Sequence, residues 1–216
     1  MDAKERWGNR FLGFYAFDEV GGYQLDSNQY RPVREADNIT DASKRFIMTI
    51  DRSLNYINVG YTESTSFPLF TSDYALYWFD YKGGYNVVLA QLGWNYSRQL
   101  NIAQVRGAAT VQGKEWGTII TWTYNDPPYI ESGPELYNDL VLAYENGAKY
   151  IVIFDSNKDY SGGILKNEHL EAMRHFWRYS KENPRNAEAI VARIAFVLPK
   201  GYAYGFRGPT DTIWGL

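Results

Sequence analysis

Three separate apolar, aromatic runs of this chain end in the dipeptide Phe-Asp, at residues 17–18, 79–80 and 154–155. Buried parallel strands are continuous apolar runs, and parallel α/β proteins build their chemistry at the carboxyl ends of such strands. The first two runs continue alike, as F-D-x-x-G-G-Y, so each predicted strand would leave the sheet through an acidic residue and a permissive double-glycine turn. We therefore predict one sheet edge that carries Asp18, Asp80 and Asp155.

Amphipathic segments separate the apolar runs, which predicts a parallel sheet with right-handed crossovers. Ser132 and Glu135 form the pattern of a capping box, and Asn167 precedes a further periodic segment that stops at Asn183-Pro184. A helix is also predicted from about residue 97 to 109, and another where isoleucine and leucine recur at helical spacing over residues 47–57. The predicted strands are residues 11–17, 74–79, 116–124, 150–154 and 194–198.

Five β/α units predict a parallel (β/α) barrel-type fold of the α/β class that is only part of a TIM barrel, because a closed barrel needs eight units. We expect a single domain over residues 1–216 with an aromatic tail over residues 200–216. An open arc of strands exposes two edges and an apolar face. Another copy or a missing segment should therefore complete the barrel, and a homodimer is the expected assembly.

Composition excludes several classes of partner and site. The formal net charge is −3 and no dense Lys/Arg block occurs, so nucleic acid is not an expected partner. The absence of cysteine excludes disulfides, thiolate metal sites and a cysteine nucleophile, and is mildly typical of thermophilic or secreted proteins. No apolar run reaches the roughly 20 residues of a membrane span. The cellular compartment is not predicted.

Aromatic residues make up 17% of the chain, including 19 Tyr and 7 Trp. Tyr and Trp offer a flat apolar face with a polar group, which suits stacking on sugar rings but equally suits a core or an interface. At the predicted edge the candidates for sugar contact are Tyr81, Trp122 and Tyr124, and the tail adds Trp214 with Arg207 as a partner for hydroxyl groups. Both interpretations stay open at this point.

Asp18 and Glu19 are adjacent at the end of a predicted strand, so at least one of them can point into a cleft. Hydrolysis of a glycosidic bond needs two carboxyl groups, one as proton donor and one as nucleophile or base. Asp80 and Asp155 are candidates for the second group. The alternative is that these acids cap helices or pair with basic side chains.

Four stretches resemble the C-terminal part of uncharacterised, largely archaeal glycoside-hydrolase-like (β/α)8-barrel proteins. They are LGFYAFDEVGGYQLD, YALYWFDYKGGYNVVLAQLGWN, RGAATVQGKEWGTIITWTYNDPPY and YENGAKYIVIF, and the similarity covers nearly the whole chain. The first motif in that family carries D-E-P-G-G, whereas Val20 stands here in place of proline. The resemblance implies that the first strand corresponds to the fourth strand of a full barrel, where many barrel glycosidases keep their acid/base glutamate, and so favours Glu19 as proton donor.

Other sites receive little support from the sequence. The D-x-N-x-D pattern from Asp155 resembles the start of a calcium loop, but Tyr160 and Lys166 stand where that loop needs Gly and Glu. His169 and His175 lie six apart on one predicted helix and are not a zinc pair. Neither a metal nor a cofactor is expected. The sequence thus predicts a glycoside hydrolase acting on a carbohydrate substrate, with a non-catalytic carbohydrate-binding or assembly protein as the alternative.

Overall fold

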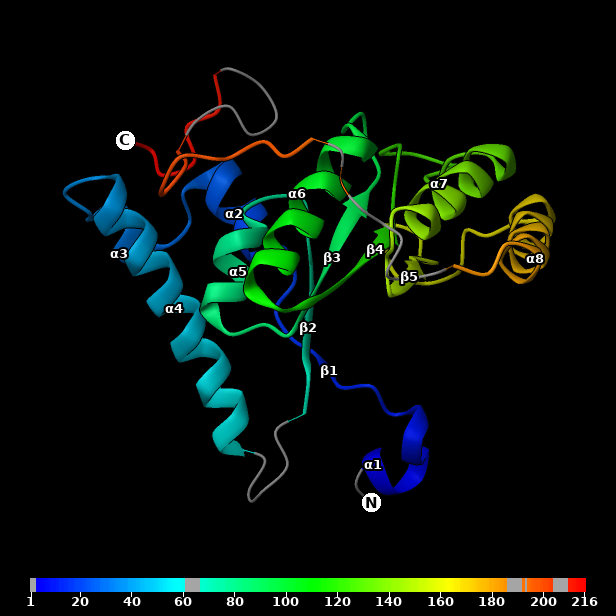
Figure 1. Ribbon diagram of the computed structural model, residues 1–216, viewed down its shortest axis with the longest axis horizontal. Coiled ribbons are helices and arrows are strands. Elements are labelled where there is room, and N and C mark those ends of the chain that lie inside the picture. Colours follow the sequence, from blue (N-terminus) through cyan, green and yellow to red (C-terminus); the bar gives the residue numbers. More distant parts are fainter. Residues whose placement is uncertain (1–2, 61–66, 186–191, 193, 204–209) are drawn as a thin grey trace. The chain divides into compact units, whose positions relative to one another are not determined.

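The computed structural model describes residues 3–60, 67–185, 192, 194–203 and 210–216. Five parallel strands follow one another in the sheet in chain order, which confirms the predicted α/β class and partial (β/α) barrel (Figure 1). They are β1 (Phe14–Tyr15), β2 (Leu69–Asp73), β3 (Val87–Leu92), β4 (Glu115–Ile120) and β5 (Tyr150–Ile153). Phe14 pairs with Leu69 across β1 and β2, and Gly117 pairs with Tyr150 across β4 and β5.

The chain divides into two compact units. The first comprises residues 1–88 together with 201–216, and the second comprises residues 89–200. The tail therefore belongs with the N-terminal part of the chain, although 112 residues separate them in sequence. That one domain covers residues 1–216 stays a prediction.

In the first unit, a long helix packs beside two shorter ones, because α4 contacts both α3 and α5 (Figure 1). The helices of this unit are α1 (Ala3–Trp7), α2 (Val20–Ser27), α3 (Arg31–Arg34), α4 (Ile39–Gly60) and α5 (Tyr77–Gly83), with a 3-10 turn, η1, at Gly8–Arg10. The apolar face predicted for α4 is confirmed at Ile50 and Leu54, which are both buried.

Aromatic side chains of the tail complete the core of the first unit. The Trp214 ring lies 5.6 Å from Phe46 and 5.1 Å from Phe79, and Tyr202 lies 5.0 Å from Phe79, measured between ring centroids. The Trp214 Nε1 donates to the Gly201 carbonyl at 2.9 Å. Trp214, a predicted sugar contact, is instead buried, because its ring packs against Phe46 and Phe79 in this core.

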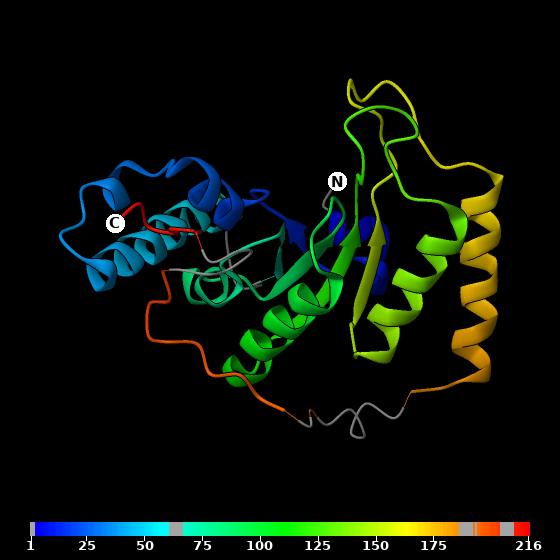
Figure 2. The ribbon, with the colours of Figure 1, turned by 90° about the horizontal axis from the view of Figure 1, so that it is seen from above.

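In the second unit, α7 and α8 lie side by side and α7 also contacts β4 and β5 (Figure 2). Its helices are α6 (Arg98–Gln112), α7 (Gly133–Glu145) and α8 (Asn167–Glu182). The predicted capping box is present, since Glu135 accepts from the Ser132 N–H at 2.9 Å. Ser97 caps α6, and Asn183 ends α8 as predicted.

Two predicted strands are wrong. Residues 74–79 are not a strand, because β2 ends at Asp73 and α5 begins at Tyr77. A short apolar run can be a buried strand or a buried helix, and its periodicity does not separate the two. Residues 194–198 carry no regular structure, and Ile194 and Phe196 are 89% and 86% exposed. A strand needs a neighbour for its backbone groups, and this apolar run has none among the described pairings.

No helix within the described residues is long and apolar enough to span a bilayer.

Candidate functional site

Left-handed backbone is concentrated in the loops that follow the strands. Within the described residues, seven amino acids other than glycine have a positive φ between 45° and 64°, and six of them lie between a strand and the next helix. These are Phe17 and Glu19 after β1, Leu76 after β2, Trp94 after β3, Tyr129 after β4 and Tyr160 after β5. Such conformations cost free energy and cluster at functional sites. The carboxyl ends of the strands are therefore the face to search first.

In the first unit, Asp18 is held at the end of β1 by two hydroxyl groups. Tyr15 and Ser72 both donate to the Asp18 Oδ1 at 2.5 Å, and their oxygens lie 2.8 Å apart. Burial and then the hydrogen bond to Asp18 raise the pKa of the Tyr15 hydroxyl, so Tyr15 remains a donor at neutral pH. Asp18 itself is exposed to solvent, which leaves it at the surface of this edge.

Glu19 follows directly and precedes the first residue of α2. Its backbone has a φ of 53°. The Glu19 N–H donates to the Ser72 carbonyl at 2.9 Å, and its carbonyl accepts from the Tyr23 N–H at 2.8 Å. The side chain is half-buried. These bonds fix the backbone of Glu19 between β2 and α2.

A carboxyl group that the sequence analysis did not select, Asp73, ends β2. It is fully buried and accepts four backbone N–H groups: Gly21 at 2.6 Å, Gly22 at 2.9 Å, Tyr74 at 2.8 Å and Ala75 at 3.0 Å. A side chain on Gly21 would place its Cβ 2.5 Å from the Ala75 carbonyl oxygen, so glycine is needed for this close approach. Asp73 thus joins the first turn of α2 to the end of β2. The residues T-S-D at the end of the apolar run from Leu69 are the signal that could have revealed it.

Asp80 does not lie at a strand end, and this part of the prediction is wrong. It lies within α5 and is fully buried, so it cannot reach a substrate at the strand ends. Neither of its carboxyl oxygens has a hydrogen-bond partner within the described residues. Burial, and next the nearby charge of Asp73, raise the pKa of Asp80 well above its usual range. The repeated motif therefore folds in two ways. The first copy is a loop that enters the first turn of α2 at Val20, and the second copy is largely helical, within α5, which ends at Gly83.

Burial also raises the pKa of Asp73, to about 8, but its four amide donors act against that rise. No such donor acts on Asp80. Of this buried pair, Asp80 therefore holds a proton more tightly than Asp73.

Asp155 lies two residues beyond β5 and is exposed. Its Oδ1 accepts the backbone N–H groups of Ile164 at 2.6 Å and Leu165 at 3.0 Å, which closes the loop that leads to α8. Asn157 and Asp159 accept hydrogen bonds from Ser161 in the same loop. Within the described residues no group of three or more acidic, His or Cys side chains could hold a metal ion.

In the second unit, the loops after β3 and β4 line an open, shallow hollow of about 650 Å³, which we call the Trp94 hollow. It is lined by Trp94, Asn95, Thr123, Tyr124, Asn125, Asp126, Pro127 and Pro128. Two aromatic rings, two amides and one carboxyl group thus surround one open space. The predicted contact residue Tyr124 lies in this hollow and is 46% exposed.

The other predicted aromatic contacts are not in the lining of this hollow. Trp122 packs against Tyr129, with ring centroids 5.6 Å apart, and its Nε1 donates to the Ser156 carbonyl at 2.8 Å. Trp122 therefore joins the loop after β4 to the loop after β5. Tyr81, another predicted sugar contact, lies on the buried face of α5 and is only 3% exposed, so its ring is not open to a ligand in this structure. Arg207 lies outside the described residues.

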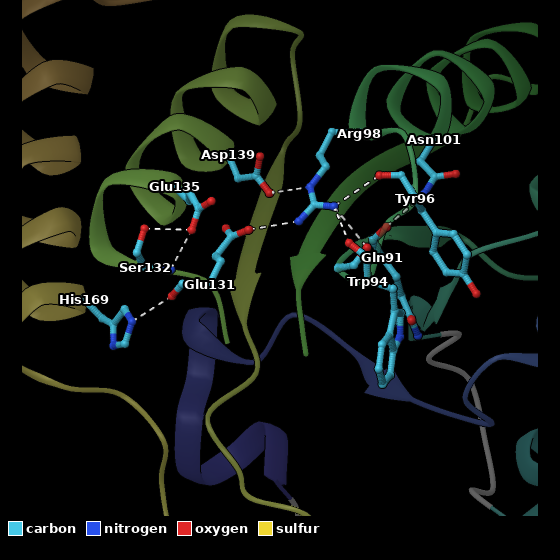
Figure 3. A network of polar contacts seen from close by, with 11 residues as sticks. Gln91, Trp94, Tyr96, Arg98, Asn101, Glu131, Ser132, Glu135, Asp139 and His169 are labelled. Carbon is cyan, nitrogen blue, oxygen red and sulfur yellow. Dashed lines mark hydrogen bonds and ion pairs between the residues drawn. The ribbon is translucent and has the colours of Figure 1, made fainter. Parts of the chain in front are cut away.

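A polar network is centred on Arg98, which follows the segment that carries Trp94 (Figure 3). Arg98 Nε donates to Asp139 at 3.0 Å and Nη2 donates to Glu131 at 2.9 Å. Nη1 lies within 3.1 Å of the carbonyl oxygens of Gly93, Trp94 and Tyr96. Sequence reasoning did not find this network, because its members come from separate segments and match no motif.

The sequence was compared with known protein families and with curated proteins. No model of a known protein family matches the chain, and no curated protein matches it either. The function of the chain is therefore inferred from the geometry and chemistry of the site.

Proposed function

We propose that this chain is a carbohydrate-binding protein and that the Trp94 hollow holds the sugar. The observation that carries the proposal is the meeting of Trp94 and Tyr124 with Asn95, Asn125 and Asp126 around one open space. Sugar rings present apolar C–H faces that suit aromatic surfaces, and their hydroxyl groups need amide and carboxyl partners. The position at the carboxyl ends of β3 and β4 agrees with where parallel sheets bind ligands.

The test is a panel of oligosaccharides measured by titration calorimetry against the wild type, Trp94→Ala and Tyr124→Ala. Loss of one stacking ring should weaken binding about tenfold. Trp177→Ala is the matched control, because Trp177 is an exposed ring on α8 that does not line the hollow. Equal affinity in the wild type and both hollow variants, or no binding by any sugar in the panel, would contradict the proposal.

Glycoside hydrolysis is the second candidate function, and it rests on Glu19 and Asp18. Both lie at the carboxyl end of β1, where Glu19 has strained backbone and Asp18 is exposed. Asp80 no longer supplies the second carboxyl group, because it is buried in α5. Turnover of fluorogenic glycosides that is lost in Glu19→Gln, with sugar binding retained, would support hydrolysis; unchanged turnover would exclude Glu19 as proton donor.

A further inference from the structure

Arg98 is the first residue of α6 and lies directly after the segment that carries Trp94. Its guanidinium group reaches back to three carbonyl oxygens of residues 93–96 and forward to Glu131 and Asp139 (Figure 3). Only a planar group with several N–H donors can make these contacts together, and lysine lacks that geometry. Arg98 therefore ties one loop of the hollow to the residues beyond the other.

The second loop of the hollow runs from β4 to α7 and ends at Glu131, beside the cap residue Ser132. The Glu131 carbonyl is anchored as well. His169 Nδ1 accepts the Lys166 N–H at 2.8 Å, so His169 Nε2 carries the proton and donates to the Glu131 carbonyl at 2.9 Å. Both loops that line the hollow thus meet at Arg98 and Glu131.

The charges at this junction do not balance when all groups are ionised, because one guanidinium faces two carboxylates. The side chains of Glu131 and Asp139 are only 4% and 12% exposed. The Glu131 Oε1 has no hydrogen-bond partner within the described residues. A second uncompensated negative charge in such a place is costly, whereas one proton makes the cluster neutral.

The directions of the pKa shifts agree with one proton being shared by the two carboxyl groups. Burial, and then the charge of Asp139, raise the pKa of Glu131 to about 7, although Arg98 lowers it. Burial also raises the pKa of Asp139, and Arg98 again acts against the rise. The other groups near the pair are Glu135, which accepts from Ser132, and His169, whose two nitrogens are used as described. Glu131 is therefore the group that releases its proton near neutral pH.

We propose that Arg98 is the positioning residue of the Trp94 hollow and that it holds the hollow ready for sugar only while Glu131 and Asp139 share one proton. When the proton leaves, the second carboxylate draws the guanidinium away from the carbonyl oxygens of residues 93–96. The loop that carries Trp94 then loses its contacts with Arg98 and keeps only its backbone bonds, such as the Trp94 N–H to the Trp122 carbonyl at 2.9 Å. This inference rests on the proposed sugar binding for its ligand, but the movement of Trp94 can be observed without any ligand.

The ligand-free test uses protein labelled with 5-fluorotryptophan, in which the Trp94 resonance is identified by comparison with Trp94→Phe. In the wild type this resonance should shift with pH with a midpoint near 7. Glu131→Gln keeps the shape of the side chain without an ionisable proton, so the shift should vanish. A Trp94 resonance that does not titrate, or that titrates equally in Glu131→Gln, would overturn the proposal.

The second test measures the affinity for a sugar found in the oligosaccharide panel between pH 5.5 and 8.5. Wild-type affinity should fall as the pH rises through about 7, while Glu131→Gln should bind equally well across the range. Arg98→Lys should weaken binding at least about tenfold at pH 5.5 with an unchanged circular dichroism spectrum, whereas the surface control Arg178→Lys should not. At pH 8.5 the affinities of the wild type and Arg98→Lys should converge, because the wild type has then released the proton. Normal affinity at pH 5.5 in a folded Arg98→Lys protein would overturn the positioning role. If Trp94 titrates as expected and no sugar binds, the coupling stands and the proposed function fails.

Discussion

Replacing Asp73 by asparagine should destabilise the first unit far more than the same change at Asp80. Asp73 accepts four backbone N–H groups with its two oxygens, three at Oδ1 and one at Oδ2. Asparagine offers one carbonyl oxygen and one NH2 group. If the oxygen stays with the three donors at Oδ1, the NH2 group faces the Gly21 N–H, and donor then meets donor.

The magnitude follows from this geometry. At pH 9, above its pKa of about 8, Asp73 is ionised. A hydrogen bond to a charged group contributes about 2 kcal/mol, and a buried donor left without an acceptor costs about 2 kcal/mol more. The free energy of unfolding should therefore fall by about 4 kcal/mol, a large part of the roughly 5–15 kcal/mol that stabilises ordinary domains. Asp80→Asn is the matched control, because both carboxyl oxygens of Asp80 have no hydrogen-bond partner within the described residues. At the same pH it should not lower the free energy of unfolding, because a neutral amide avoids the cost of burying a charge that raises the pKa of Asp80 well above its usual range.

The measurement is urea unfolding followed by far-ultraviolet circular dichroism, with free energies obtained by linear extrapolation. If Asp73→Asn does not fold while Asp80→Asn does, the result still shows that the change at Asp73 is the more destabilising of the two. Equal stability of Asp73→Asn and wild type would refute the view that Asp73 joins α2 to β2. A larger loss in Asp80→Asn than in Asp73→Asn would refute the assignment of the tighter-held proton to Asp80.

Three further outcomes are expected. The unfolded chain releases the Asp80 proton near pH 4 while the folded protein keeps it, so wild-type stability should fall relative to Asp80→Asn as the pH rises above about 4; melting temperatures that stay parallel from pH 4 to 8 would contradict this. Trp214→Ala should cost about 3–5 kcal/mol of unfolding free energy and Trp177→Ala less than about 0.5 kcal/mol, because only Trp214 is buried; similar urea midpoints would show that the tail does not stabilise the core. Light scattering should give a mass above that of one chain, because β1 and β5 end the described strand order with edges that invite pairing; a monomer at micromolar concentration would contradict the predicted homodimer.

Helices whose ends carry local signals were predictable from the sequence. Three of these signals act within a few residues. Ser97 and the Ser132 capping box accept or donate hydrogen bonds in the first turn of a helix, and Asn183-Pro184 ends α8 because proline has no N–H to continue it. Such interactions form in the same way wherever the helix lies in the fold. The sequence therefore specified α6, α7 and α8 closely.

The region between β2 and β3 could not be assigned in the same way. Residues 74–79 are apolar throughout, so this run contains no polar residue to reveal a helical period. The exposed residue of α5, Lys82, comes only after the run. Asp80 was consequently expected at a strand end, whereas Asp73 has that position. As a result, the sequence analysis placed Asp80 at the surface although it is buried, and it did not select Asp73, which accepts the backbone N–H groups at the end of β2.

The aromatic residues predicted to contact sugar include both buried and exposed side chains, which the sequence did not distinguish. Tyr81 and Trp214 are buried in the first unit, whereas Tyr124 is exposed in the Trp94 hollow. An aromatic side chain serves a core and a binding surface equally well, so its type alone does not decide between them. Trp94 was not selected at all, because nothing in the sequence indicates that its backbone is left-handed.

That left-handed backbone gives the strongest reason to place function at the carboxyl ends of the strands. Phe17, Leu76 and Trp94 are large residues in a conformation that glycine adopts without strain, and each such position costs roughly 1–2 kcal/mol. A loop that served only to connect elements could lower this cost with glycine, which the chain uses freely elsewhere. A large side chain at Trp94 is retained at a cost in stability, and the hollow that it lines is where that side chain can repay the cost through binding.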